Sequence, residues 1–347
     1  MGKRIAYIDL AKGICISIVM LFHIRGICAN TMPLSPVMFS ACMLPPFFFL
    51  SGVFFKEEVS YGIFLRKKVD RLLLPFLFFY LATAVVLPNV LHYIFGMRFE
   101  TTTGWSSLWA FIWPGEYPNI PLWFLWCLFI VNNIFRLLLS LSKAINEKRH
   151  HIILILFCLS CAVVGISSED HLQTDFANLF KALKNMPLFC FGYILSHFDT
   201  LSKIESMGTR RRLWALFIAI AISLLSCLTY DNLWTNAVMY YVYGTGGAAL
   251  VIILSLIIVQ MPLISFLGRY SIIVLLTHGL MVRAGHTLFQ HLSRFIPSYI
   301  SVAAFWMCMV CSYFAIVPFC KKFLPHVTAQ KSLFYQQLNH EESSPFH

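Results

Sequence analysis

Residues 8–23, with the sequence IDLAKGICISIVMLFH, decide the fold of this chain. The stretch is apolar enough to begin a membrane-spanning helix, yet it contains Asp9, Lys12 and His23. Eleven helical steps from Lys12 to His23 make about 1100°, within about 20° of three full turns, so both side chains share a helix face about 16 Å apart. Asp9 and Asn30 fall within about 40° of the same face. Ionisable residues in membrane helices usually face the bundle interior and mark a functional path, so we expect chemistry on this face.

The composition indicates an integral membrane protein. Of 347 residues, 59% are hydrophobic and only 12% are charged, whereas about 25% are charged in an average soluble domain. A stretch of about 20 apolar residues spans a bilayer as a helix, with its backbone groups paired internally. We expect an all-α, polytopic membrane helix bundle over residues 1–327 and a polar, mobile cytoplasmic tail over residues 328–347. The ten expected spans are residues 8–29, 37–55, 73–95, 120–141, 151–167, 185–198, 213–230, 236–260, 264–288 and 299–320.

The distribution of Lys and Arg predicts the orientation and argues against nucleic-acid binding, despite a net charge of +11. The basic residues form no continuous patch but lie in alternate connectors. Cytoplasmic connectors are enriched in Lys and Arg, so the richer set is cytoplasmic and both termini face the cytoplasm. The richer set has 17 residues: Lys3, Arg4, Lys56, Arg66, Lys67, Lys68, Arg71, Lys143, Lys148, Arg149, Lys203, Arg210, Arg211, Arg212, Lys321, Lys322 and Lys331; the other has 4: Arg98, Lys181, Lys184 and Arg294.

The stripe of Asp9, Lys12 and His23 has two interpretations. In the functional one, burial disfavours the imidazolium ion, so a neutral His23 accepts a proton as a general base. In the structural one, Lys12 extends to the membrane interface and His23 bonds a neighbouring helix. Three ionisable groups on one face favour the functional interpretation.

A basic segment precedes the third span. Arg66, Lys67, Lys68 and Arg71 lie within six residues, around Asp70, and helical spacing clusters them. They could hold the phosphates of a cytosolic, nucleotide-like cofactor, or anchor the chain to anionic lipid. The residues alone favour the anchor.

The second span contains PPFFFLSG at residues 45–52. The two prolines free backbone carbonyls and kink the helix, while Gly52, next to Ser51, allows close backbone approach. Such breaks are tolerated where they line a cavity or are buried by protein.

The ninth span adds Ser271 and His278, which are seven residues apart and share a face. His23 and His278 have no intramembrane carboxylate or thiolate beside them, which makes a poor metal site. We expect no metal, and interpret His278 as a buried core histidine or a second polar group of the active site.

The connector over residues 96–119 is expected to lie on the outer side of the membrane. It carries Trp105, Trp109, Trp113 and Glu116. An interfacial aromatic belt explains the tryptophans best, although they could also stack on sugar rings.

The ordered set of these elements resembles the acyltransferase 3 family of integral-membrane O-acyltransferases, in its fucose 4-O-acetylase-like branch. The similarity covers residues 4–280. Its elements are Lys12 with His23, Pro46-Phe47 with Ser51-Gly52, Lys67 and Arg71 with Pro75, Leu122-Trp123-Phe124-Leu125, and Gly268, Ser271 and His278.

The resemblance implies acyl transfer from cytosolic acyl-CoA, with acetyl-CoA as the default co-substrate. The acceptor would be a hydroxyl of a cell-surface or capsular carbohydrate, and the location the bacterial inner membrane. His23 would be catalytic, with Lys12 and Asp9 on the same helix face, and the basic segment would hold the CoA phosphates. The further candidates for substrate contact or support are Ser51, Glu116, Trp123, Ser271 and His278.

A polytopic exporter of a sugar-linked or small-molecule substrate is the alternative, because ten helices with a buried charged stripe also suit transport. Transporters often show inverted repeats with broken helices at matching positions. The double proline of the second span has no counterpart five spans later, which favours the enzyme.

Overall fold

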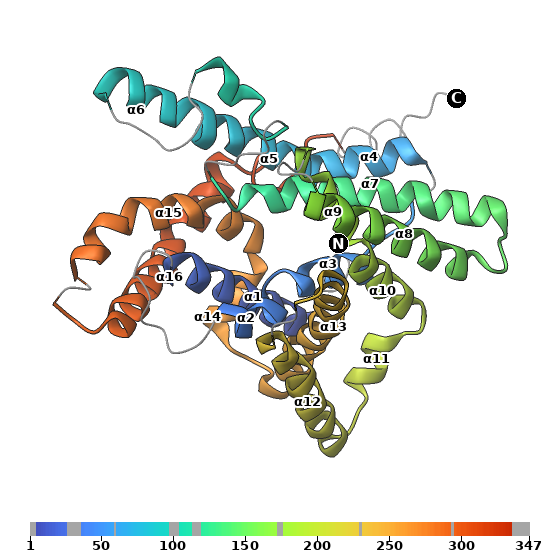
Figure 1. Ribbon diagram of the computed structural model, residues 1–347. Coiled ribbons are helices and arrows are strands. Elements are labelled where there is room, and N and C mark those ends of the chain that lie inside the picture. Colours follow the sequence, from blue (N-terminus) through green and yellow to red (C-terminus); the bar gives the residue numbers. More distant parts are fainter. Residues whose placement is uncertain are drawn as a thin grey trace, which may run out of the picture. The chain divides into compact units, whose positions relative to one another are not determined.

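The computed structural model describes residues 5–25, 36–58, 60–96, 104–112, 119–171, 176–228, 231–292 and 295–334. Every regular element in these ranges is a helix, which confirms the all-α prediction (Figure 1). The α-helices are α1 (Ala6–Arg25), α2 (Pro36–Met43), α3 (Pro45–Val53), α4 (Tyr61–Lys68), α5 (Leu74–Tyr80), α6 (Leu87–Phe95), α7 (Leu122–Ile145), α8 (His150–His171), α9 (Leu179–Lys184), α10 (Met186–His197), α11 (Thr200–Glu205), α12 (Thr209–Leu224), α13 (Leu233–Ile258), α14 (Pro262–Arg269), α15 (Ser271–Leu292) and α16 (Ser298–Phe323). The π-helices are η1 (Val69–Leu73) and η2 (Leu81–Val86), and the 3-10 helices are η3 (Trp105–Leu108), η4 (Phe176–Asn178) and η5 (Leu225–Cys227).

Several helices are long and apolar enough to cross a bilayer, so the chain is an integral membrane protein. Six such helices occur within the described ranges, and a seventh span results if α14 and α15, bent by 92°, count as one. Ser40–Val53 and Met186–His197 are shorter apolar helices. The count of ten spans and the cytoplasmic position of the termini remain predictions. The six helices cover Ala6–Ile24, Tyr61–Ile94, Leu122–Ile145, His150–Ser168, Leu233–Ile258 and Tyr299–Phe323.

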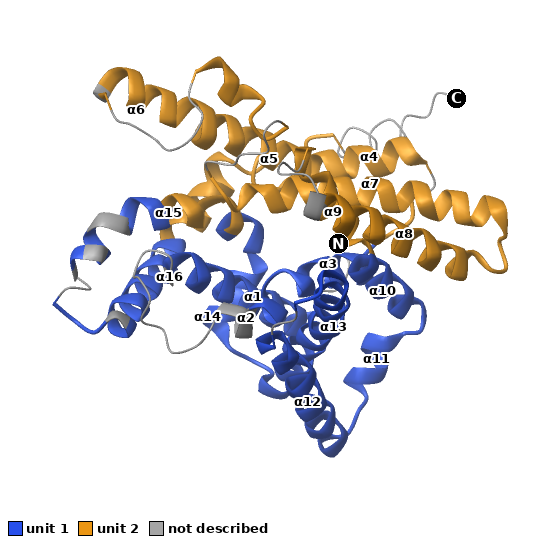
Figure 2. Cartoon of the chain, viewed as in Figure 1, with its two compact units in different colours: residues 1–55, 187–274, 281–314 blue, residues 56–186, 275–280, 315–347 orange. Residues whose placement is uncertain are grey.

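The chain divides into two compact units, coloured separately in Figure 2. Unit 1 comprises residues 1–55, 187–274 and 281–314. Unit 2 comprises residues 56–186, 275–280 and 315–347.

In unit 1, α1 and α14 pack with their backbones almost touching, because each contributes a glycine at the contact. A Cβ atom added at Gly13 would lie 1.9 Å from the carbonyl oxygen of Ile264. One added at Gly268 would lie 1.8 Å from the carbonyl oxygen of Asp9 and 2.5 Å from the Gly13 nitrogen. Small residues let membrane helices approach this closely, so the two glycines fix where α1 meets α14.

A second close contact joins α3 to α10 and confirms the predicted role of Gly52. A Cβ atom added at Gly52 would lie 1.9 Å from the carbonyl oxygen of Phe189. In return, a Cβ atom at Gly192 would lie 2.1 Å from the carbonyl oxygen of Phe49.

The prolines divide helices where the sequence predicts. α2 ends at Met43 and α3 starts at Pro45, so the expected kink is a break between two short helices. α13 ends at Ile258 and α14 starts at Pro262, so the chain is interrupted between the expected spans 236–260 and 264–288.

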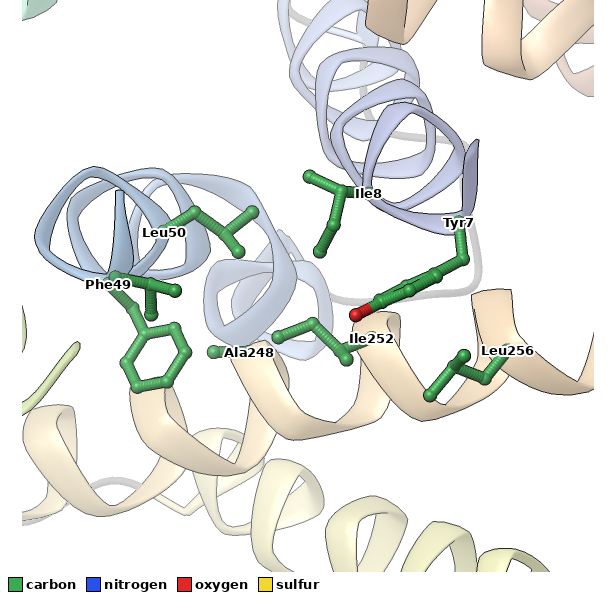
Figure 3. Packing of buried hydrophobic residues seen from close by; sticks show 8 residues of the cluster. Tyr7, Ile8, Phe49, Leu50, Ala248, Ile252 and Leu256 are labelled. Carbon is green, nitrogen blue, oxygen red and sulfur yellow. The ribbon is translucent and has the colours of Figure 1, made fainter. Parts of the chain in front are cut away.

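Apolar side chains from α1, α3 and α13 form a core cluster in unit 1. Figure 3 shows Tyr7 and Ile8 of α1 beside Leu50 of α3 and Ile252 of α13. Lipid is as apolar as leucine, so close van der Waals packing holds membrane helices together here. The full cluster is Tyr7, Ile8, Phe49, Leu50, Val53, Ala248, Ile252 and Leu256.

In unit 2, one helical run from α4 to α6 contains two π-helical segments. η1 ends at Leu73, before Pro75, and η2 ends at Val86, before Pro88. Proline has no N–H and its ring clashes with the carbonyl four residues earlier. The wider π turns accommodate both defects without ending the run.

Candidate active site

Asp9 and Lys12 lie on α1 and each contacts another segment of unit 1. Oδ2 of Asp9 lies 3.8 Å from Nε of Arg269, the last residue of α14. The ammonium of Lys12 lies 5.5 Å from the centre of the Phe54 ring, next to the end of α3, within range of a cation–π attraction. The Arg269 side chain is 46% exposed, so its ion pair contributes at most about 1 kcal/mol. Both residues therefore have packing contacts besides any role in catalysis.

His23 lies near the end of α1 and is half-buried. α1 is continuous from Ala6 to Arg25, so the helical geometry that puts Lys12 and His23 on one face is preserved. The Phe22 ring meets the imidazole edge-on, with 5.6 Å between the ring centres. The imidazole is partly covered and partly accessible, which suits a group that must meet a substrate.

The Gly-x-x-Ser element of residues 268–271 lies against the first helix. Gly268 contacts the backbone of Asp9, and Arg269 carries the ion pair to its carboxylate. Ser271 begins α15 directly after the bend. The structure thus brings together an early and a late element of the sequence pattern. Ser51 is half-buried on α3, next to the Gly52 contact.

The lysines of the basic segment have neighbours in unit 2. Nζ of Lys67 lies 2.7 Å from Oε1 of Glu58. Nζ of Lys68 lies 5.2 Å from the centre of the Phe64 ring. Arg66 and Arg71 are exposed, so their guanidinium groups are the more accessible cations of this segment.

Asp70, within the same segment, is 3% exposed and binds the end of the described chain. Its Oδ2 accepts a hydrogen bond of 2.5 Å from the Ser332 hydroxyl and one of 3.1 Å from the Phe334 N–H, while Oδ1 accepts one of 3.3 Å from the Leu333 N–H. No local sequence pattern predicts this contact, because Ser332 lies 262 residues away from Asp70. Residues 332–334 of the expected mobile tail are thus bonded to the basic segment, and residues 335–347 lie outside the described ranges.

Arg136, on α7, fixes the segment that leads into α4. Its Nη1 lies 3.2 Å from Oε1 of Glu57, and its Nη2 donates a 3.1 Å hydrogen bond to the carbonyl oxygen of Glu58. Nζ of Lys143, two turns further along α7, lies 2.6 Å from Oε2 of Glu57. Arg136 was not among the residues predicted from the sequence, although an arginine inside an apolar helix usually indicates a structural or functional partner.

His278 is completely buried on α15, next to a contact that the sequence reasoning also missed. Nδ2 of Asn119 donates hydrogen bonds of 3.1 Å to Oγ1 of Thr83 and to the carbonyl oxygen of Leu276. A Cβ atom at Gly279 would lie 2.6 Å from Oδ1 of Asn119. Asn119 therefore contacts α15 on both sides of His278 in the sequence. Its position just before the Leu-Trp-Phe-Leu element is the feature of the sequence that could have identified it.

Trp123 stands at the start of α7, and the Lys181 ammonium lies 5.6 Å from its ring. Glu116 lies outside the described residues. Among the described residues, no group of three or more His, Cys, Asp or Glu side chains is arranged to hold a metal ion.

The candidates fall into two sets. Those of unit 1 gather on α1 and its neighbours, whereas those of unit 2 lie on the basic segment, α7 and α15. The first set is Asp9, Lys12, His23, Ser51 and Ser271, and the second is Arg66, Lys67, Lys68, Arg71, Trp123 and His278.

These features define an integral membrane protein with ionisable side chains built into its helices. A family model for an acyltransferase domain matches residues 5–319. The chain therefore belongs to the acyltransferase 3 family and is a membrane acyltransferase. This confirms the family resemblance; the fucose 4-O-acetylase-like branch remains a prediction. No curated protein and no solved structure matches the chain.

Proposed function

We propose that this acyltransferase moves an acyl group, acetyl by default, from cytosolic acyl-CoA to a hydroxyl of a cell-surface or capsular sugar. The observation that carries the proposal is the contact between α1 and α14. It joins the helix of Asp9, Lys12 and His23 to the Gly268–Ser271 element, within the matched acyltransferase domain.

His23 is the general base in this proposal. It takes the proton of the acceptor hydroxyl while the oxygen attacks the thioester carbonyl carbon. The new C–O bond forms, the C–S bond breaks, and CoA leaves as a thiolate that recovers the proton from the imidazolium. A positioned base of this kind contributes about 10²–10⁴-fold to the rate. An acyl-histidine intermediate is the other route by which His23 could act.

The basic segment is the proposed donor site. CoA carries phosphates, and a guanidinium group binds phosphate through two parallel hydrogen bonds. Arg66 and Arg71 are exposed, which supports this role, and Lys67 and Lys68 add charge. Lys12 acts on phosphate or pantetheine only as a point charge, so we assign it to guiding the pantetheine arm or orienting the site along the helix face that it shares with His23.

The orientation of the chain in the membrane and the roles of the other candidate residues are also part of the proposal. Both termini face the cytoplasm of a bacterial inner membrane, so that the donor site meets cytosolic acyl-CoA. Ser51, Trp123, Ser271, His278 and Glu116 are the candidates for contacting the acceptor or supporting the residues that do. The match to the acyltransferase family model does not support the alternative function as an exporter.

Radiolabelled acetyl-CoA turnover in membranes tests the base. We expect His23→Gln to lower transfer to carbohydrate by about 10²-fold or more, with expression and thermal unfolding equal to wild type. His291→Gln, at an exposed position of α15, is the matched control and should retain full activity. Normal transfer by His23→Gln would refute the role of His23.

The donor site is tested separately. Arg71→Ala should raise KM for acetyl-CoA about tenfold or more, because one charged hydrogen-bond partner of a phosphate is lost, with little change in kcat. Arg211→Ala, at an exposed position of α12, should leave KM unchanged. Equal KM values for Arg71→Ala and wild type would remove the basic segment from the donor site.

A further inference from the structure

The chain after α16 forms a turn over residues 324–334, which belong to unit 2. The N–H groups of Gln330 and Lys331 both donate to the carbonyl oxygen of Pro325, at 2.8 Å and 2.9 Å. Thr328 is completely buried, and its hydroxyl donates to a backbone carbonyl four residues earlier, at 2.7 Å. These bonds give the C-terminal turn a defined path toward the basic segment.

The C-terminal turn ends on the carboxylate of Asp70, in the middle of the basic segment. The Ser332 hydroxyl and the consecutive N–H groups of Leu333 and Phe334 donate to this carboxylate. The Phe334 N–H reaches both oxygens, Oδ2 at 3.1 Å and Oδ1 at 3.3 Å. Asp70 is 3% exposed, and burying a charge is strongly unfavourable unless it is paired or hydrogen-bonded. Three successive residues of the turn therefore satisfy one buried carboxylate.

Its position in the sequence would give Asp70 different partners. Asp70 lies four residues after Arg66 and directly before Arg71, on one helical run. An acidic and a basic side chain at this helical spacing attract each other. Within the described ranges, however, no ion pair joins Asp70 to either arginine, and both arginines are exposed. The hydrogen bonds from the C-terminal turn thus hold the carboxylate away from the two guanidinium groups.

A released Asp70 carboxylate would compete with the acyl donor. Guanidinium groups bind carboxylates and phosphates through the same paired hydrogen bonds. An Asp70 side chain turned toward Arg66 or Arg71 would therefore occupy the N–H groups that a phosphate of acyl-CoA needs. It would also reduce the local positive charge that attracts the phosphates. The affinity of the donor site then depends on where this one carboxylate is held.

We propose that residues 332–334 are positioning residues of the donor site. They occupy the Asp70 carboxylate, so Arg66 and Arg71 are left to the phosphates of acyl-CoA. This inference rests on the proposed assignment of the basic segment to acyl-CoA. It gives a role in donor affinity to residues that lie beyond the matched acyltransferase domain, which ends at residue 319.

Two full-length variants that loosen the same contact test this inference, because only one of them keeps the charge of Asp70. Ser332→Ala combined with Phe334→Pro removes two donors and releases a charged carboxylate. We expect it to raise KM for acetyl-CoA about fivefold, the effect of one exposed ion pair, with kcat unchanged. Asp70→Asn loosens the turn but leaves no charge to compete, so its KM should not exceed that of wild type. Proteolysis after Lys331 should be faster than in wild type in both.

Adding Asp70→Asn to the double variant should restore the KM of wild type, which a merely structural role of the turn would not allow. An equal rise in KM for Asp70→Asn and the double variant would overturn the inference, because the charge would then have no part. If Arg71→Ala raises KM but the double variant does not, the inference is wrong and the donor site stands. If Arg71→Ala leaves KM unchanged, the donor site and the inference are both wrong. Should the double variant fail to fold, Phe334→Pro alone decides, because it removes the N–H that reaches both oxygens.

Discussion

Adding one methyl group at Gly268 should force α1 and α14 apart. The Cβ atom of Gly268→Ala would lie 1.8 Å from the carbonyl oxygen of Asp9 and 2.5 Å from the nitrogen of Gly13. Both clashing atoms belong to the backbone, so no side-chain rotation relieves them. The helices must move by more than about 1 Å to restore ordinary van der Waals contact.

The size of the effect follows from the packing. Overpacking a core costs about 1–3 kcal/mol, occasionally more, and a rigid backbone on both sides places Gly268→Ala at about 3 kcal/mol. This corresponds to a fall of about 5 °C or more in the unfolding temperature. The movement also separates Asp9 from Arg269, which are 3.8 Å apart, so acyl transfer should fall together with stability.

Thermal unfolding of the full-length protein can be followed with a thiol-reactive fluorophore. Cys15 and Cys42 are buried in unit 1, so they become reactive when its helices separate. Gly208→Ala is the matched control, because a Cβ atom there meets nothing within 4 Å. Its φ of −64° also suits alanine. Unfolding of Gly268→Ala within about 1 °C of Gly208→Ala would refute the close contact between α1 and α14.

Two further substitutions test contacts of unit 2. Asp70→Asn removes the charged acceptor of the hydrogen bonds from residues 332–334. It should weaken the attachment of these residues by about 1–3 kcal/mol and speed proteolysis after Lys331 about tenfold. Equal cleavage rates for the variant and the wild type would contradict this expectation. Arg136→Ala should destabilise the protein by about 2 kcal/mol, because the arginine is 9% exposed and its loss removes the charged bond to Glu57 and the hydrogen bond to the carbonyl oxygen of Glu58. Lys143→Ala, whose ion pair with Glu57 is more exposed, should cost about 1 kcal/mol or less. Equal unfolding temperatures for these last two variants would show that burial does not distinguish the two ion pairs.

The helical class, the membrane environment and the family could be predicted because they depend on local rules. A bilayer offers no hydrogen bonds to the backbone, so long apolar stretches must become helices. The face shared by Lys12 and His23 follows from the helical period alone, and continuous α1 preserves it. Prolines likewise predict helix breaks, because the proline ring clashes with the preceding turn and proline has no backbone N–H to donate.

Partners distant in the sequence were decided only by the tertiary structure. Asp70 lies among the basic residues of its own segment in the sequence, but its carboxylate binds residues 332–334. Gly268 was expected only as part of the Gly268, Ser271 and His278 element, and Gly13 had no expected role, but the two glycines form one contact. Sequence fixes which groups exist and which share a helix face, whereas pairing across helices depends on sub-ångström packing of backbones that no local pattern encodes.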